Sequence, residues 1–207
     1  MTKHLTGKRI LTIAVAVAVV ALTGAGATFA RESAPIPADP VGALYERLIV
    51  RAELPGFTSP ICPSVETNAS RWARGNLSVD QLRRNGFVAG LRQTLHSNRL
   101  DADALVSVAL FGSAHDARIE IANEIASARR SAGSFAPFPV ASIPTARGFA
   151  LRSPGIAGYN VVFADGPYVY LVGIGFVAGT AKHRSNGQTI ATATALYGRV
   201  HALGSAH

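Results

Sequence analysis

The sequence predicts an α+β domain with a five- or six-stranded, largely antiparallel sheet packed with helices in an α-β-α sandwich-like arrangement. Two observations lead to this fold class. Short segments with apolar residues at every second position, typical of half-buried strands, follow one another with turns between them. Segments with apolar residues three and four positions apart, typical of amphipathic helices, stand before, between and after them. The resulting order is helix, strand pair, helix, three-stranded meander, helix.

The first third of the domain is predicted to contain two helices. Residues 40–51 place their apolar side chains on one helical face, with Asp39 as N-cap. Residues 58–77 are polar and expected to be irregular. Residues 78–81 form an S-x-x-Q capping box, which predicts the start of a short helix that Gly86 ends.

A strand pair and a long helix are predicted next. Alternating apolar residues over 87–95 and 105–111 indicate two strands, which would form a hairpin across the polar loop 96–103. Residues 113–130 carry an apolar stripe at helical spacing. The segment begins with Ser113, a residue type that often caps a helix N-terminus. The two arginines at its end complement the negative end of the helix dipole.

The last third is predicted to be a meander followed by a helix. Residues 134–146 hold three prolines and are expected to be a loop. Residues 165–167 (Asp-Gly-Pro) form a tight turn, and Gly173 and Gly175 leave one face of the last strand open to a helix or a ligand. A helix is expected over 188–203. The three strands are predicted at 148–152, 158–164 and 168–176.

The first thirty residues have the pattern of a secretory signal peptide. A basic start precedes an apolar run over 10–22, and residues 25–27 are a small-residue A-x-A site. The alternative is an uncleaved membrane anchor over 10–30. We therefore expect a leader over 1–30, a Pro-rich linker over 31–40 and a single domain over 41–207, exported to the cell envelope or beyond it.

Charge and cysteine content narrow the classes of partner. The chain has a formal net charge of +8 and a single cysteine, Cys62, so no disulfide can form within the chain. The arginines are scattered without interleaved aromatic residues, which argues against nucleic acid as a partner of an exported protein. Cys62 lies between two prolines and is a candidate for an intermolecular disulfide or a reactive thiol, or a passive, partly buried small residue.

The candidate ligand-binding residues form two groups. Aromatic side chains alternate along the last two predicted strands and would line an apolar groove between sheet and helix, or belong to the core. Lys182 and Arg184 precede the last helix and could hold an anion at its N-terminus. A small apolar or anionic ligand, or an envelope protein, is the expected partner. The aromatic group is Tyr159, Phe163, Tyr168, Tyr170 and Phe176.

Catalysis is the second interpretation. Ser113 and His115 lie at the start of the long helix and could form a nucleophile and base in a small secreted hydrolase, as could Cys62 with a base elsewhere. The alternative for Ser113 is helix capping. The sequence contains no nucleophile elbow, zinc-protease motif, phosphate-binding loop or dinucleotide fingerprint, so no cofactor or metal is predicted.

A resemblance supports the binding interpretation. Residues 52–57 (AELPGF) and the run over 158–175 resemble segments of exported actinobacterial proteins of unknown role. The element order is similar to the Mog1/PsbP-like sandwich of some mycobacterial lipoproteins and to the extracellular sensor domains of mycobacterial Ser/Thr kinases. This resemblance implies a non-catalytic envelope module that binds a ligand or a partner protein, and it transfers no functional residue.

Overall fold

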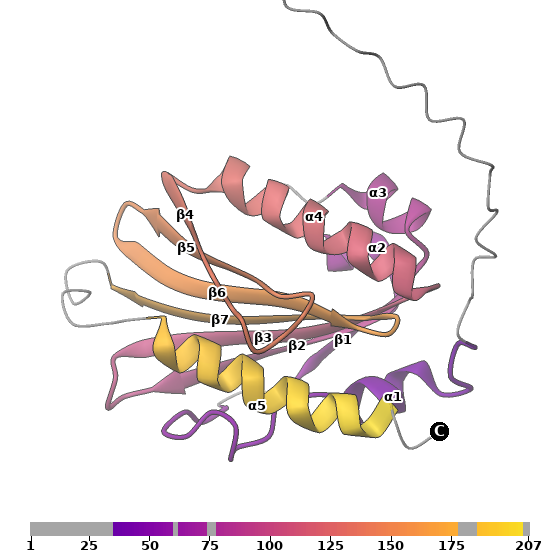
Figure 1. The fold of residues 1–207 in the computed structure, drawn as a ribbon, viewed down its shortest axis with the longest axis horizontal. Coiled ribbons are helices and arrows are strands. Elements are labelled where there is room, and N and C mark those ends of the chain that lie inside the picture. Colours follow the sequence, from indigo (N-terminus) through magenta and orange to yellow (C-terminus); the bar gives the residue numbers. More distant parts are fainter. Residues whose placement is uncertain (1–34, 60–61, 74–77, 178–185, 205–207) are drawn as a thin grey trace, which may run out of the picture. The chain divides into compact units, whose positions relative to one another are not determined.

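Seven strands form one antiparallel sheet with the order β1-β2-β3-β7-β6-β5-β4 (Figure 1). The computed structural model describes residues 35–59, 62–73, 78–177 and 186–204. The predicted α+β class is confirmed, with seven strands in place of five or six. The strands are β1 (Ser64–Glu66), β2 (Phe87–Ser97), β3 (Ala102–Phe111), β4 (Ser134–Phe138), β5 (Arg147–Ser153), β6 (Ile156–Asp165) and β7 (Tyr168–Val177).

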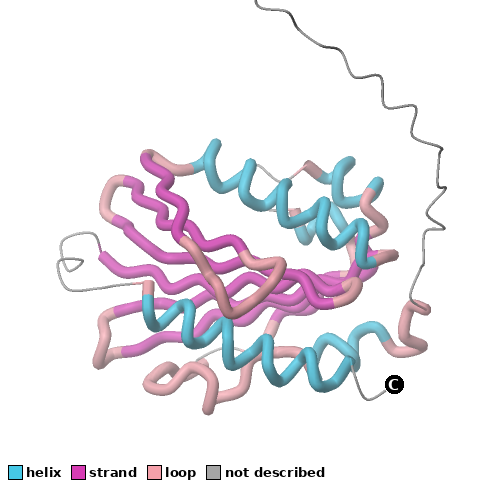
Figure 2. The backbone as a smooth tube through the Cα atoms, in the orientation of Figure 1, coloured by secondary structure: helices cyan, strands magenta, loops and turns pink. Residues whose placement is uncertain are grey.

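Helices cover both faces of the sheet (Figure 2). On one face, here named the α4 face, α4 packs with α2 and α3 against Ala109 and Phe111 of β3. On the other, the α5 face, α1 and α5 pack against Val106 and Val108 of the same strand. Alternate residues of β3 therefore serve two cores. The helices are α1 (Pro40–Glu46), α2 (Ala69–Trp72), α3 (Val79–Arg84), α4 (Ala114–Ser131) and α5 (Gly187–Gly204).

Side-chain caps begin four of the described helices, and the sequence predicts three of them; the fourth is Asn68 at α2. The Asp39 carboxylate accepts from the backbone N–H of Gly42 at 2.9 Å, and the Ser78 hydroxyl accepts from that of Gln81 at 3.3 Å. Ser113 caps α4. Each cap satisfies an N–H group that the first helical turn leaves without an intrahelical acceptor.

The two additional strands are the sheet edges. β1 falls within 58–77, expected to be irregular, and β4 falls within 134–146, expected to be a loop. β1 has only three residues, and β4 contains Pro137, which an edge strand tolerates because its outer side needs no hydrogen bonds. Neither segment has apolar alternation, because each is held by pairing with one neighbour rather than by burying a face.

The first helix is shorter than predicted, ending at Glu46 rather than at residue 51. The carbonyl oxygens of Glu46 and Leu48 accept hydrogen bonds from the Arg199 guanidinium of α5, at 2.7 and 2.6 Å. Carbonyl groups at a helix end need such partners. Arg199, far along the chain, thus supplies the hydrogen-bond donors that the carbonyl groups at the end of α1 need. Helical periodicity within 40–51 could not indicate this contact.

The predicted leader over 1–30 lies outside the described residues. Where the structure describes the chain, it contains no helix that is both long and apolar enough to cross a membrane. The leader and the linker over 31–40 stay predictions from the sequence.

Candidate functional site

The α4 face includes a stretch of sheet that carries no side chains. Gly158 on β6 is the register partner of Gly175 on β7, and Gly173 lies on the same face as Gly175. A Cβ at position 158 would stand 3.0 Å from the carbonyl oxygen of Ile174. At position 175 the nearest atom would be 3.8 Å away, which leaves room for a side chain. The three glycines form a glycine floor across two strands, with no side chains of its own and with the Asn160 side chain over Gly173.

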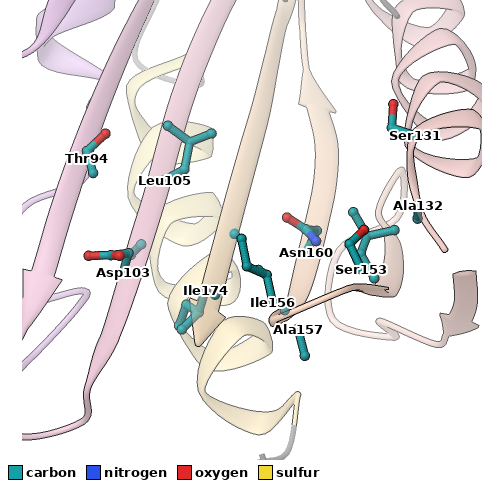
Figure 3. A pocket seen from close by; sticks show the side chains of 15 residues that line it. Thr94, Asp103, Leu105, Ser131, Ala132, Ser153, Ile156, Ala157, Asn160 and Ile174 are labelled. Atoms are coloured by element: carbon teal, nitrogen blue, oxygen red, sulfur yellow. The ribbon is translucent and has the colours of Figure 1, made fainter. Parts of the chain in front are cut away.

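A hollow of about 410 Å³ stands on this floor beside the C-terminal end of α4 (Figure 3). Its volume is typical of small-molecule sites, and most of its lining is apolar. The lining comes from five strands and from the end of α4. It consists of Thr94, Asp103, Ala104, Leu105, Ser131, Ala132, Leu151, Ser153, Ile156, Ala157, Gly158, Asn160, Gly173, Ile174 and Gly175.

Large apolar side chains around the hollow are exposed to solvent. Leu105 is 40% exposed and Ile156 is 64% exposed, and both line the hollow. Val177, the register partner of Ile156, is 55% exposed. They are uncovered because α4 ends at Ser131, at the wall of the hollow. Exposed apolar side chains gathered around a hollow are typical of a binding site.

Polar groups in the hollow are few. The Asn160 amide lies over Gly173, in the space that a side chain there would occupy, and it has no hydrogen-bond partner among the described residues. Thr94 and Asp103 lie toward one side of the hollow, and Ser153 lies toward the other (Figure 3). A few polar groups in an apolar site usually fix the orientation of a ligand.

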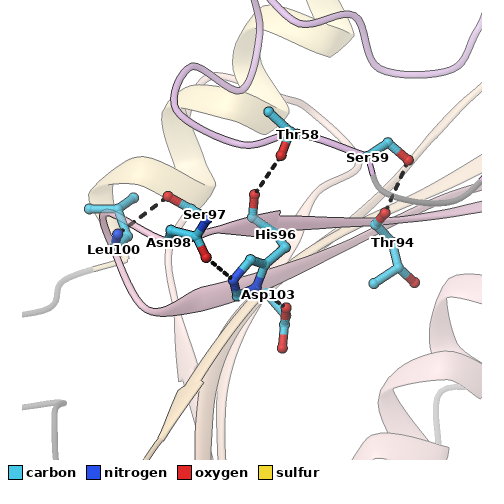
Figure 4. A network of polar contacts seen from close by, with 8 residues as sticks. All are labelled: Thr58, Ser59, Thr94, His96, Ser97, Asn98, Leu100 and Asp103. Atoms are coloured by element: carbon cyan, nitrogen blue, oxygen red, sulfur yellow. Dashed lines mark hydrogen bonds and ion pairs between the residues drawn. The ribbon is translucent and has the colours of Figure 1, made fainter.

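Asp103 is held in position by His96, its register partner across the β2–β3 hairpin (Figure 4). His96 Nδ1 lies 2.8 Å from Asp103 Oδ1, and Nε2 lies 2.9 Å from Asn98 Oδ1. The hydrogen bond to Asp103, followed by that to Asn98, raises the pKa of His96. The His96 backbone also exchanges two hydrogen bonds with Thr58, which ties the hairpin to the segment after α1.

A second cavity of about 440 Å³ lies between α4 and the connection from β4 to β5. Its walls include Phe138 at the end of β4 and Val140 and Ile143 of that connection, and these side chains also pack against the α5-face core. The Arg129 guanidinium lies 4.7 Å from the Phe135 ring at its border. These walls are parts of the core packing, so the glycine-floored hollow is the stronger candidate site.

The predicted aromatic face lies opposite the hollow, on the α5 face. Phe163 and Tyr170 are fully buried with their rings stacked at 4.8 Å, and Tyr197 of α5 meets Phe163 edge-on. Burial also raises the pKa of Tyr170. These positions match the alternative that the sequence left open, a core. Contact with a ligand stays a prediction, which burial does not favour. The remaining members are Tyr159, Tyr168 and Phe176, partly or fully buried in the same cluster.

The other predicted binding residues are not brought to the hollow. Lys182 and Arg184 lie outside the described residues, so their anion site stays a prediction from the sequence. Cys62 is an exposed free thiol in the segment before β1. Within the described ranges, no three His, Cys, Asp or Glu side chains are grouped so as to hold a metal ion.

Ser113 is engaged in helix capping rather than in a nucleophile–base pair. Its hydroxyl donates to Asp116 Oδ2 at 2.6 Å and accepts from the Asp116 backbone N–H at 3.1 Å, and both side chains are buried. His115 is exposed on the opposite side of the first turn and has no hydrogen-bond partner in the described part of the chain. A hydrolytic site built on these residues would need a hydroxyl that substrate can reach.

We expect Ser113→Ala to lower the free energy of unfolding by about 1–2 kcal/mol, because the variant loses an N-cap. Urea unfolding of the variant and the parent protein measures this loss. An assay with a p-nitrophenyl ester provides the complementary test. Unchanged stability together with loss of an esterase activity would contradict the capping role.

No protein-family model matches this chain, and no curated protein matches its sequence. Solved structures that match include the extracellular domain of PknH from Mycobacterium tuberculosis. It is 12% identical, with a TM-score of 0.50, over 80% of this chain and 97% of that domain. A putative uncharacterised protein from Mycobacterium smegmatis is 11% identical, with a TM-score of 0.34, over 74% of this chain and 97% of its own. The first similarity shows a shared fold, in agreement with the resemblance to extracellular domains predicted from the sequence.

Proposed function

We propose that this protein is an exported, non-catalytic envelope module that binds a small, mainly apolar ligand in the glycine-floored hollow. The observation that carries the proposal is the pairing of Gly158 with Gly175 in a hollow whose rim exposes Leu105 and Ile156. Glycine within a strand weakens it and exposes apolar surface nearby, so such a floor is typical of a place where another molecule approaches the backbone.

Export is supported by two independent features. The leader pattern over 1–30 is that of a secretory signal. The fold is similar to that of the extracellular domain of PknH. Neither feature depends on the hollow, so export and ligand binding are separate parts of the proposal.

Native mass spectrometry of the protein isolated from the envelope of the cell that makes it tests the binding part. We expect a complex with an additional small mass. The matched variant is Gly175→Val, because a side chain at this position enters the hollow and meets no atom closer than 3.8 Å at its Cβ. The added mass should disappear, while thermal stability stays equal or rises, since valine favours strands.

Gly198→Ala is the control, because Gly198 lies on the exposed side of α5 with open space around it. It should keep the bound mass. A parent protein that carries no added mass would contradict the proposal, as would a Gly175→Val variant that binds as the parent does. A retained signal sequence would contradict the expected cleavage but not ligand binding.

A further inference from the structure

We propose that the hollow selects amine-bearing apolar molecules, with the ammonium group at Asp103 and the apolar body over the glycine floor. This inference rests on the proposed function, since it names the class of ligand for the same site. It is carried by the charge of the lining and by the position of the end of α4.

Asp103 is the only ionisable side chain among the described residues that line the hollow. All other lining side chains are apolar or neutral. A carboxylate or phosphate brought into this lining would lose water and meet no cationic lining side chain, which is costly. An ammonium group would instead meet an opposite charge at the edge of an apolar site.

The geometry of Asp103 leaves one carboxylate oxygen available. Oδ1 is engaged by His96, whereas Oδ2 has no hydrogen-bond partner among the described residues. His96 and Asp103 are register partners in a hairpin, so the imidazole fixes the direction of the carboxylate. A ligand ammonium can therefore bind at Oδ2 without displacing His96.

The end of α4 adds to the negative potential of the same site. Ser131 is the last residue of the helix and Ala132 its C-cap, and both line the hollow. The final carbonyl groups of a helix carry its negative partial charge, which favours cations. The last turn of α4 also carries Arg129 and Arg130, and neither lines the hollow. The Arg129 guanidinium lies over the Phe135 ring, 4.7 Å from its centroid.

Asn160 supplies a neutral anchor inside the hollow. Its amide stands over Gly173 without a hydrogen-bond partner among the described residues. It can accept from an N–H of the bound head group or donate to a ligand oxygen. The amide therefore suits a ligand whose polar part reaches from Asp103 toward the centre of the floor.

Three probes with one apolar chain test the inference: n-octylamine, n-octanol and n-octanoate. Their affinities for the exported protein at pH 7 are measured by isothermal titration calorimetry. We expect octylamine to bind at least about ten-fold more tightly than octanoate, with octanol between them. Asp103→Asn should remove most of this difference, whereas Asp101→Asn, in the exposed turn nearby, should retain it.

His96→Gln separates the effect of the Asp103 charge from that of the His96 imidazole. The variant loses the imidazole contact to Asp103 but keeps the carboxylate. This variant should keep the preference for octylamine. Equal or tighter binding of octanoate would overturn the amine preference and leave the proposed function standing. Binding of none of the three probes would overturn both, and a preference that survives in Asp103→Asn would overturn the role of Asp103.

Discussion

Arg199→Ala is expected to lower the free energy of unfolding by about 3–5 kcal/mol, because it leaves a buried carboxylate without its partner. Arg199 lies on α5 and its Nε is 2.7 Å from Glu53 Oε1. The Glu53 side chain is only 7% exposed. Without the guanidinium, the negative charge of Glu53 would lie in a site with little access to water and no cationic partner from α5.

The same side chain holds α1 to α5. Besides Glu53, the guanidinium donates to the carbonyl oxygens of Glu46 and Leu48, and Glu53 Oε2 also accepts from the backbone N–H of Val50. One planar group thus closes the end of α1 and fixes the turn after it. Arg199→Lys should recover only part of the loss, because a single ammonium cannot reproduce the fork of donors.

Urea unfolding of the three proteins measures these differences. Arg118→Ala is the matched control, since Arg118 is exposed on α4 and has no partner in the described part of the chain. Its stability should stay within about 0.5 kcal/mol of the parent. Arg199→Ala with the same stability as the control would contradict the structural role given to this ion pair.

Glu124→Gln is expected to stabilise the protein at pH 8 by about 2–3 kcal/mol more than at pH 5. Glu124 and Glu120 stand one turn apart on α4, on the side that packs against Ser107 of β3. Burial, and then the charge of Glu120, raises the pKa of Glu124 to about 7, and Arg92 opposes this only in part. Burial also raises the pKa of Glu120.

The direction in which stability changes with pH follows from proton uptake on folding. An acid with a raised pKa in the folded state binds its proton more tightly there, so stability falls as pH rises from the ordinary glutamate range through about 7. One oxygen of Glu120 accepts from Asn85 and Asn123, at 3.0 Å each, and the other is buried without a partner in the described part of the chain. The neutral amide at position 124 removes the repulsion that appears when both acids ionise.

Urea unfolding at pH 5 and pH 8 gives the stability difference between variant and parent at each pH. Histidines titrate in this range too, and comparing the variant with its parent cancels their effect. Glu46→Gln, at an exposed position on α1, is the matched control. A pH-independent difference for Glu124→Gln would contradict the raised pKa.

Local sequence signals predicted the central parts of this fold. The caps at Asp39, Ser78 and Ser113 and the turn at 165–167 depend on neighbouring residues, and all are present in the structure. The edges β1 and β4 could not be predicted, because pairing with another strand defines them. The end of α1 was missed for a similar reason, since Arg199 reaches it from the far end of the chain.

The candidate site was predictable only in part. Alternation along β7 indicated that Gly173 and Gly175 share a bare face. That Gly158 lies opposite Gly175 depends on strand register, which the sequence did not show. The exposure of Leu105 and Ile156 depends on where α4 stops relative to the sheet. The strong aromatic alternation along β6 and β7 belongs to the α5 face, where large side chains fill the core.

The order of strands in the sheet has a consequence for folding. Every neighbouring pair of strands in the sheet is consecutive in the chain except β3 and β7. In the sequence, α4, β4, β5 and β6 lie between these two strands. Pairing between distant strands is slow because a long loop must close first. The two meanders, β1–β3 and β4–β7, are therefore expected to form first and to join at this seam. The hollow takes Asp103 and Leu105 from one side of the seam and its glycines from the other, so a chain whose two halves have not joined does not contain the hollow.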